Sequence, residues 1–381
     1  MTEQIKPDLN FINSVINSGG ESLKKCYQCS TCTVVCNVTP DDKPFPRKEM
    51  VQAQWGMKDK LFSNPDIWLC HQCSDCTAYC PRGAKPGEVL GAVRKLSIEH
   101  YAAVPFLGKA VGSPKFLLLL LAIPVIIFAS ALIMQGHSFI PEGNLVYAES
   151  FMKVPYIDTI FIVTALFAVF CFFKGITSYW KDLSAGNPAG GSIVGALTDT
   201  ITEFLGHNKF RQCEVTADRS RSHLFTFYGF VGLAVTTTWA IIYLYGSELL
   251  GIKAFSVFHF GESPYPLTDP MKILGNFSGA ALLIGITLVI INRVKNAGKA
   301  GIGSYYDWLF IGIIITIVTT GLMSEILRLL KIPAMAYPVY FLHLVAIFFL
   351  FAYAPFSKMA HMAYRTTALV YAKQAGRDKE K

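Results

Sequence analysis

Charged residues are scarce in this chain of 381 residues. Asp, Glu, Lys and Arg together make up only 16% of it, whereas hydrophobic residues make up 52%. Soluble globular domains usually contain about 25% charged residues, so much of this chain must have a solvent other than water. The composition therefore excludes an ordinary soluble enzyme as a description of the whole chain.

Two common sequence signals are also missing. The N-terminal stretch MTEQIKPDLNFINSVINSGG has no apolar core behind a basic flank, so we expect no cleavable signal peptide. No G-x-G-x-x-G fingerprint occurs, so we expect no dinucleotide bound by that route. Cysteine is nearly absent after residue 80, since eight of the ten cysteines lie within the first 80 residues. In a reducing cytoplasm such clustered thiols bind metal rather than pair as disulfides.

The early cysteines form two runs with the same spacing, C-x2-C-x2-C-x3-C. The first run lies in KKCYQCSTCTVVCN and the second in WLCHQCSDCTAYCPRG, where Pro81 follows the last cysteine. In two-cluster ferredoxins three cysteines of a run bind one [4Fe–4S] cluster and the fourth reaches the other cluster. The predicted ligands of the first cluster are therefore Cys26, Cys29, Cys32 and Cys80. Those of the second cluster are Cys70, Cys73, Cys76 and Cys36.

The alternative for these cysteines is a pair of structural zinc sites. Zinc sites usually take their thiolates as two separated C-x2-C pairs rather than four in one run, so the spacing favours the iron–sulfur clusters. The two remaining cysteines, Cys171 and Cys213, are interpreted as ordinary buried or loop thiols.

Six long apolar segments follow, each near the roughly 20 residues that an α-helix needs to cross a bilayer. They cover about residues 115–134, 156–173, 224–245, 273–291, 308–327 and 338–356. Soluble core helices are the alternative, but six runs of this length favour membrane spans. If the N-terminus is cytoplasmic, the connections on that side carry most of the Lys and Arg, as the positive-inside rule requires. We therefore expect a multi-pass protein of the inner (cytoplasmic) membrane, with both termini and the iron–sulfur domain in the cytoplasm.

Histidines near the ends of the apolar segments are candidate haem ligands. His223 opens the third segment and His361 follows the sixth on the same side, so the two could face each other across the bundle and hold an inner haem b. His343 lies about 27 Å from His361 along a helix, so it would need an outer partner, His259 or His137. An interhelical hydrogen bond is the alternative for any single histidine. His71, His100 and His207 lie outside the segments and receive no role.

The outer loop FHFGESPYPLTDPMKILGN is a candidate cap for a quinone pocket, in which Glu262, Asp269 or Lys272 would handle protons. A plain hairpin connection is an equally good interpretation, and no catalytic residue is assigned.

The predicted fold is mainly α. Residues 1–112 are expected to form a helical, ferredoxin-like domain that holds two [4Fe–4S] clusters, with short helices before Gly19 and after the second cysteine run, a helical stretch between the runs that breaks at Gly56, and almost no strand. Residues 113–362 are expected to form a six-helix transmembrane cytochrome b bundle, and residues 363–381 a basic tail.

The two parts of the chain resemble known subunits. The cysteine runs resemble the two-cluster subunit of heterodisulfide reductases, and FLHLVAIFFLFAYAPFSKMAH resembles the last helix of respiratory nitrate reductase cytochromes, with two histidines eighteen residues apart. The helix that begins at His223 resembles the two-histidine helix of that family, but it has Leu233 at the second position. No CCG sequence occurs, so the disulfide-cleaving module of heterodisulfide reductases is not expected on this chain.

The fusion of both parts, with DKPFPRKEMVQAQWGMKDK between the cysteine runs, resembles the membrane subunits (QmoC type) of quinone-interacting membrane-bound oxidoreductase complexes of sulfate-reducing bacteria. The resemblance implies two haems b, menaquinol as electron donor, and two flavin-binding iron–sulfur partner subunits (QmoA-like and QmoB-like). It also implies adenylylsulfate reductase as the acceptor in sulfate respiration. The alternatives are another sulfur-pathway oxidoreductase with the same architecture, and a redox sensor or transporter with attached clusters but no haem.

Overall fold

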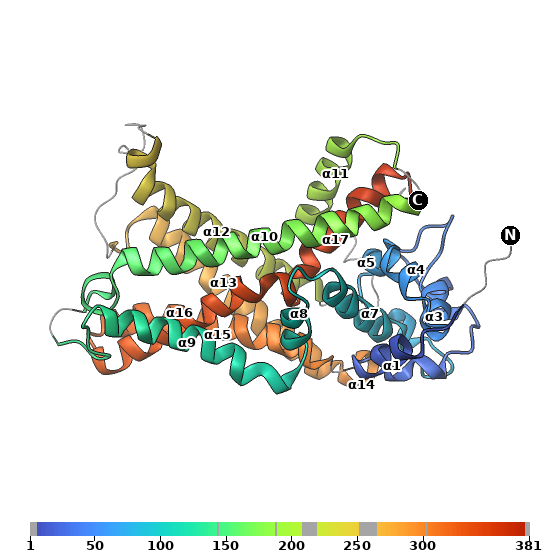
Figure 1. Ribbon diagram of the computed structural model, residues 1–381, viewed down its shortest axis with the longest axis horizontal. Helices are drawn as coiled ribbons and strands as arrows, with labels where there is room; N and C mark the ends of the chain where they lie inside the picture. The colour runs from blue at the N-terminus through green and yellow to red at the C-terminus, as the bar shows by residue number, and fades with distance from the viewer. Residues whose placement is uncertain are drawn as a thin grey trace.

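The computed structural model describes residues 6–142, 145–186, 189–207, 219–250, 265–301 and 303–377. These residues form helices joined by loops and turns, and no strand occurs among them, as the sequence predicted. Figure 1 shows an elongated molecule in which the N-terminal helices gather at one end and the long helices extend away from them.

The N-terminal part consists of short helices. They are α1 (Leu9–Asn17), η1 (Glu21–Lys25), α2 (Thr31–Val34), α3 (Arg47–Gln54), α4 (Lys58–Phe62), α5 (Asp66–Leu69), α6 (Asp75–Ala78), α7 (Pro86–Tyr101), α8 (Pro105–Val111) and η2 (Pro114–Phe116). Their apolar side chains share one core, in which Val15, Leu23, Phe45, Trp68 and Val93 are completely buried. The short helices expected from the spacing of apolar residues are therefore confirmed.

The break between α3 and α4 falls at Gly56, where the sequence predicted it. This residue has a φ of +66°, and a Cβ there would come within 2.5 Å of the backbone nitrogen of Asp8. Only glycine allows both the left-handed backbone and this close approach.

The remainder of the described chain contains longer helices. They are α9 (Leu117–Met134), η3 (Tyr147–Phe151), α10 (Val154–Gly186), α11 (Ile193–Gly206), α12 (Arg219–Leu250), α13 (Pro270–Lys295), α14 (Ala297–Ala300), α15 (Tyr305–Leu329), α16 (Pro333–Tyr353), η6 (Ala354–Phe356) and α17 (Ala360–Gln374).

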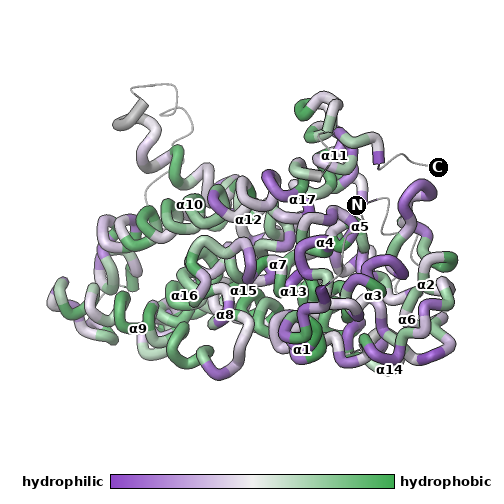
Figure 2. Tube along the Cα trace, turned by 45° about the vertical axis from the view of Figure 1, so that its right-hand side comes forward, coloured by the Kyte–Doolittle hydropathy of each residue, from purple (hydrophilic) through white to green (hydrophobic). Residues whose placement is uncertain are grey.

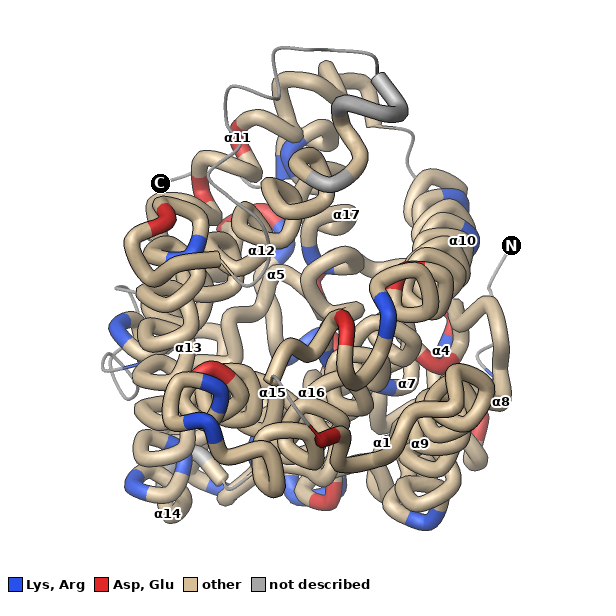
Figure 3. Tube along the Cα trace, turned by 90° about the vertical axis from the view of Figure 1, so that its left-hand side faces the viewer, with Lys and Arg blue, Asp and Glu red and all other residues tan. Residues whose placement is uncertain are grey.

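Six helical segments in the described chain are long and apolar enough to cross a membrane. They are Pro114–Met134, Val154–Ala185, Arg219–Tyr243, Pro270–Lys295, Tyr305–Leu329 and Pro333–Gln374. Hydrophobic residues dominate these helices in Figure 2, whereas hydrophilic segments gather around α3, α4 and α14. Charged residues are sparse along the same helices in Figure 3. By length and composition the chain is a multi-pass membrane protein, and the predicted six spans are confirmed.

Glycine allows α12 and α13 to pack closely. A Cβ on Gly229 would lie 2.7 Å from the backbone nitrogen of Leu282, and one on Gly285 would lie 2.5 Å from that of Thr226. Small residues at such positions let transmembrane helices approach until their backbones touch. This contact positions the first turns of α12, where His223 lies.

The last segment is interrupted, in contrast to the continuous helix assumed for the distance between His343 and His361. Helix α16 ends at Tyr353, a short 3-10 turn that contains Pro355 follows, and α17 begins at Ala360. His361 therefore lies in the first turn of a separate helix. Residues 363–374, expected to belong to a basic tail, continue α17, and most of residues 364–372 are buried.

Candidate redox centre where the cysteine runs meet the membrane helices

The two cysteine runs adopt the same local conformation. In each run the residue before the second cysteine and the residue after it have positive φ: Gln28 at 63° and Ser30 at 70°, and Gln72 at 53° and Ser74 at 70°. A short helix then carries the third cysteine, α2 in the first run and α6 in the second. Non-glycine residues rarely adopt this backbone, and strained backbone of this kind clusters at functional sites. The repeat in sequence is therefore a repeat in structure.

The fourth cysteine of each run crosses to the other run. Cys26, Cys29, Cys32 and Cys80 line one small cavity. Cys36 instead lies among thiols of the second run, close enough to Cys70 and Cys73 for both to raise its pKa, and it raises the pKa of Cys76 in turn. This is the crossed grouping that the sequence predicts, and the assignment of these cysteines as cluster ligands stays a prediction.

Thiols in both groups resist ionisation. Burial, followed by the neighbouring thiols, raises the pKa of Cys32 to about 11 and that of Cys36 to about 12. Because a thiolate is the form that binds metal, these sites need positive charge to become ligands. Iron would supply that charge.

The thiols surround space rather than a single point. Among the described residues no three His, Cys, Asp or Glu side chains lie close enough together to hold one metal ion. A cubane differs from a zinc ion in this respect, because each of its four thiolates binds a different iron.

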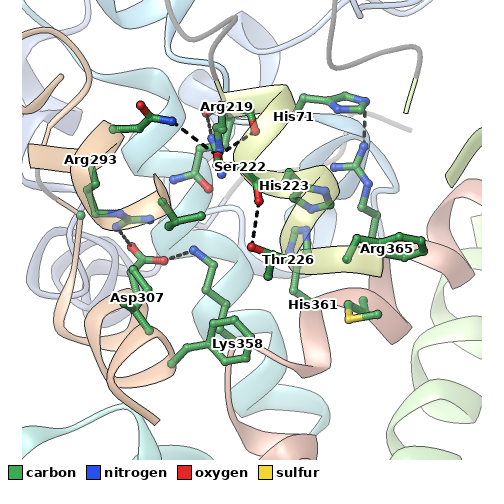
Figure 4. Close-up of a pocket in the computed structure, with 18 of the residues that line it drawn as sticks. His71, Arg219, Ser222, His223, Thr226, Arg293, Asp307, Lys358, His361 and Arg365 are labelled. Atoms are coloured by element: carbon green, nitrogen blue, oxygen red, sulfur yellow. Dashed lines mark hydrogen bonds and ion pairs between the residues drawn. The ribbon is translucent and has the colours of Figure 1, made fainter. Parts of the chain in front are cut away.

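A second and larger cavity, of about 410 Å³, lies where the second cysteine run meets α12, α13, α15 and α17. His223 on α12 and His361 on α17 both line it, and Figure 4 shows the two side chains close to each other. His343 is not among the residues that line this cavity. The structure thus brings together the predicted inner pair.

The cavity wall is rich in positive charge. Five basic side chains line it, namely Arg94, Arg219, Arg293, Lys358 and Arg365. Three acidic side chains, Glu88, Glu203 and Asp307, line it as well. Asp307 pairs with both Lys358 and Arg293, and Figure 4 shows this triad on one side of the cavity. The excess of basic groups suits a ligand that carries carboxylates.

Three of these arginines bind the backbone of the second cysteine run. Arg365 donates to the carbonyl oxygen of Cys70 at 3.1 Å, and Arg94 donates to the same oxygen at 3.2 Å. Arg219 donates to the carbonyl oxygen of Gln72 at 2.7 Å. These residues come from α17, α7 and α12 respectively. The cysteine run is therefore attached directly to two of the membrane helices that line the cavity.

Aromatic and histidine contacts join the same two regions. Trp68, two residues before Cys70, is completely buried, stacks on Tyr364 at 5.5 Å and lies 5.4 Å from the ring of His361. The Nε2 atom of His71 lies 2.8 Å from an Arg365 nitrogen (Figure 4). Side chains next to the second cysteine group thus pack directly on the helix that carries His361.

The predicted outer residues are placed differently. The Nδ1 atom of His343 lies 3.0 Å from the Thr320 hydroxyl. The Nδ1 atom of His137 lies 2.8 Å from the carbonyl oxygen of Phe151. Neither contact joins His343 to His137, and His259 lies outside the described residues. The outer haem ligands stay a prediction.

The proposed quinone-site residues also receive other contacts. Asp269 caps the N-terminus of α13 and accepts hydrogen bonds from the backbone of Met271 and Lys272. The Lys272 ammonium pairs with Glu325 at 3.0 Å. Glu262 lies outside the described residues. Asp269 thus has a structural role in the fold.

Sequence reasoning missed the basic residues and His207, which also line the cavity. Arg365 could have been found, because it lies four residues after His361 and therefore on the same face of α17. Arg94, Arg219 and His207 carry no such signal, since only the tertiary fold brings them to the cavity.

Comparison with known proteins identifies the N-terminal part. Residues 22–84 match the 4Fe-4S dicluster domain family. The C-type subunit of the H(2):CoB-CoM heterodisulfide,ferredoxin reductase of Methanothermobacter marburgensis is 36% identical over 112 residues, which cover 28% of this chain and 57% of that protein. The chain thus spans about half the length of the first curated relatives that it matches. No solved structure matches it.

Two further relatives extend the similarity into the membrane part. Citrate utilization protein B of Escherichia coli is 25% identical over 211 residues, which cover 54% of this chain and 52% of that protein. The E-type subunit of the dihydromethanophenazine:CoB--CoM heterodisulfide reductase of Methanosarcina acetivorans is 21% identical over 243 residues, which cover 58% of this chain and 91% of that protein. The N-terminal part of the chain is therefore similar to C-type subunits of heterodisulfide reductases, and the membrane part is similar to an E-type subunit.

Proposed function

We propose that this chain is the membrane subunit of a quinol-linked oxidoreductase complex of the QmoC type. It takes electrons from menaquinol and has haem b and two [4Fe–4S] clusters as carriers. It delivers the electrons to two cytoplasmic flavin-binding iron–sulfur subunits, QmoA-like and QmoB-like, that feed adenylylsulfate reductase in sulfate respiration. The observation that carries this proposal is the cavity that His223 and His361 share beside the second cysteine run.

The residues around this cavity fit haem b. Two histidines reach it from separate helices, and the basic side chains on its wall could pair with the two carboxylates of the macrocycle. When bound there, haem b would supply a one-electron carrier between a two-electron quinol and the clusters. Arg219 and Arg365 would add positive charge beside the bound group while they hold the cysteine run in place.

The position of the cavity indicates which of the two cysteine groups would receive electrons first. His71, Gln72 and Ser74 of the second cysteine run line it, whereas Cys29 of the first run is exposed. Electrons that leave the membrane helices would therefore meet the cluster of Cys36, Cys70, Cys73 and Cys76 before the other one. The exposed group would face the partner subunits on the cytoplasmic side, which the distribution of basic residues favours for the N-terminal part.

The first test is the cofactor content of the purified full chain. We expect haem b by pyridine haemochrome assay and about eight acid-labile sulfides per chain, as two cubanes require. A menaquinol analogue should reduce the haem. Replacement of either cavity histidine, in His223→Leu or His361→Leu, should abolish the inner haem and leave the sulfide content intact. A haem content that neither replacement lowers would refute the cavity as a haem site.

Control variants test whether the loss of haem is specific to the cavity histidines and whether an outer haem exists. His100→Leu changes a histidine in the N-terminal helices, away from the cavity, and should leave haem and sulfide unchanged. His343→Leu tests the outer haem, since loss of a second haem signal would assign that residue a ligand role. A wild-type chain with sulfide but no haem would overturn the cytochrome proposal and favour the redox sensor.

A heterodisulfide-reductase-like or other sulfur-pathway oxidoreductase is the second candidate. The similarity to the C-type and E-type subunits of heterodisulfide reductases favours it. Co-purification distinguishes the two candidates, because flavin-containing partners that reduce adenylylsulfate reductase support the first, and partners that act on a disulfide support the second.

A further inference from the structure

His207, which carries no sequence motif, lies directly against the cavity histidine of α12. It lines the cavity, is 4% exposed, and follows the last residue of α11 in a left-handed conformation with a φ of 52°. The Nε2 atom of His207 lies 3.0 Å from the Nδ1 atom of His223. Such a backbone is uncommon for residues other than glycine, although histidine adopts it more readily than most. A buried side chain held in this way suggests a role for its ring.

Contacts with two membrane helices hold the end of α11 in place. The ammonium of Lys373 on α17 pairs with Glu203 at 2.9 Å and donates to the carbonyl oxygen of Asp199 at 3.2 Å. On the other side, the Tyr228 hydroxyl of α12 donates to the carbonyl oxygen of Leu205 at 3.0 Å. Helix α11, which lies near α17 in Figure 1, is therefore attached to the helices that carry both cavity histidines.

The hydrogen bonds determine which nitrogens carry protons. The Nδ1 atom of His207 lies 3.3 Å from the carbonyl oxygen of Leu205, which can only accept. That nitrogen is therefore the donor, and in a neutral ring the Nε2 atom of His207 is an acceptor. The Nδ1 atom of His223 must then donate to it, so the proton of a neutral His223 is on Nδ1 and the lone pair is on Nε2.

An aromatic ring also limits the tilt of both imidazoles. Phe227 meets the ring of His207 edge to face at 5.0 Å and lies nearly parallel to that of His223, with 14° between the planes. The contacts thus restrict the rotation of both rings, in addition to fixing which nitrogen of each ring carries the proton.

We propose that His207 is a positioning residue that fixes His223 as the Nδ1-protonated tautomer, with Nε2 as the ligand atom for a metal-centred group in the cavity. This inference rests on the proposed function, because haem iron is the group that would take the lone pair. Metal-bound histidines generally donate their second ring proton to an acceptor, which orients the ring and raises its basicity. Here a second histidine is that acceptor, and its own carbonyl partner fixes the direction of the relay.

The test compares two substitutions of His207 in the purified full chain. His207→Leu removes the acceptor, whereas His207→Gln retains an oxygen acceptor at similar reach. We measure the haem content, the midpoint potential of the haem by redox titration and the g values of its ferric form. His100→Leu is the matched control, since it removes a histidine that does not line the cavity, and the sulfide content reports whether the cysteine domain is intact.

In His207→Leu we expect haem affinity to fall roughly 10- to 100-fold, as for other losses of a ligand's hydrogen-bond acceptor. The midpoint potential should rise, because a less basic imidazole stabilises ferric iron less. A selective tenfold loss for the ferric form corresponds to about 59 mV for one electron. His207→Gln should restore most of the affinity and potential. Identical changes in His207→Leu and His207→Gln would indicate a packing role and overturn the proposal.

Two other outcomes separate a failure of the inference about His207 from a failure of the proposed function. If the wild-type chain binds haem and His207→Leu matches His100→Leu in potential and g values, the inference about His207 fails while the proposed function stands. If the wild-type chain binds no haem, the proposed function fails and this inference fails with it.

Discussion

The attachment of the second cysteine run to α17 can be tested by removal of one arginine. Arg365 is 9% exposed and donates to the carbonyl oxygen of Cys70 at 3.1 Å, and its other terminal nitrogen lies 2.8 Å from Nε2 of His71. In Arg365→Met the side chain keeps an unbranched apolar stem but loses both hydrogen bonds. Each hydrogen bond to a charged group contributes about 1.5–3 kcal/mol.

The net loss should be smaller than the sum of these two bonds. Arg94 still donates to the Cys70 oxygen, so that oxygen does not become an uncompensated buried acceptor. Burial of an apolar side chain instead of a guanidinium also removes a desolvation cost. We therefore expect local opening of the run to become easier by about 2–3 kcal/mol, which is roughly a 30- to 150-fold change in the opening equilibrium.

Hydrogen exchange of the full chain in lipid nanodiscs measures this change. The backbone amides of Ala78 and Tyr79 bond to Ser74 and Asp75 within the run and report its opening. Lys85→Met is the control, because its pair with Glu88 is half exposed and such pairs contribute little. Equal exchange rates in Arg365→Met and Lys85→Met would refute the attachment.

Three other predictions concern the cysteines, a buried acid and the α12–α13 contact. Cys80→Ser should alter the electron paramagnetic resonance signal of the cluster held by the first run, and Cys36→Ser that of the second; the opposite assignment would exclude the crossed grouping. Burial, and then the neighbouring Asp66, raises the pKa of Glu49 above its ordinary value of 4.5, so the folded state binds a proton that the unfolded state releases. The free energy of unfolding should therefore fall as pH rises above that value, and Glu49→Gln should flatten this dependence in denaturant titrations, whereas an unchanged slope would contradict it. Gly285→Ala places a Cβ 2.5 Å from the backbone of α12 and should destabilise the bundle by about 1–3 kcal/mol in thermal unfolding. The Cβ of Gly312→Ala faces open space, so this control should not destabilise the bundle. Equal effects of the two substitutions would refute close packing of α12 and α13.

Several elements follow from local sequence alone. The six spans were predictable because a membrane helix must satisfy its backbone internally and face lipid with apolar side chains, so its length and composition are enough. The short helices around Gly56 and after the second cysteine run were predictable from the spacing of apolar residues. The dicluster domain was predictable because three thiolates of one cluster lie within seven residues of sequence.

The break before α17 was missed, although a proline marks it. Pro338 and Pro124 both lie inside helices of the same bundle, so proline alone does not distinguish a kink from an end. Because of this break, α17 is a separate helix. Trp68, which precedes the second cysteine run, packs on its first turn at His361.

The sequence by itself determined the kinds of groups present: eight thiols in two runs, histidines near the ends of apolar helices, and the membrane solvent that those helices require. Only the tertiary structure decided that Arg94, Arg219, Arg365 and His207 meet around one cavity. Their partners lie far away along the chain, since Arg365 is 295 positions from Cys70 and Arg219 is 147 positions from Gln72. Hydrogen bonds of such reach leave no periodic trace in the sequence, because they depend on how whole helices pack and not on which residues are neighbours along the chain.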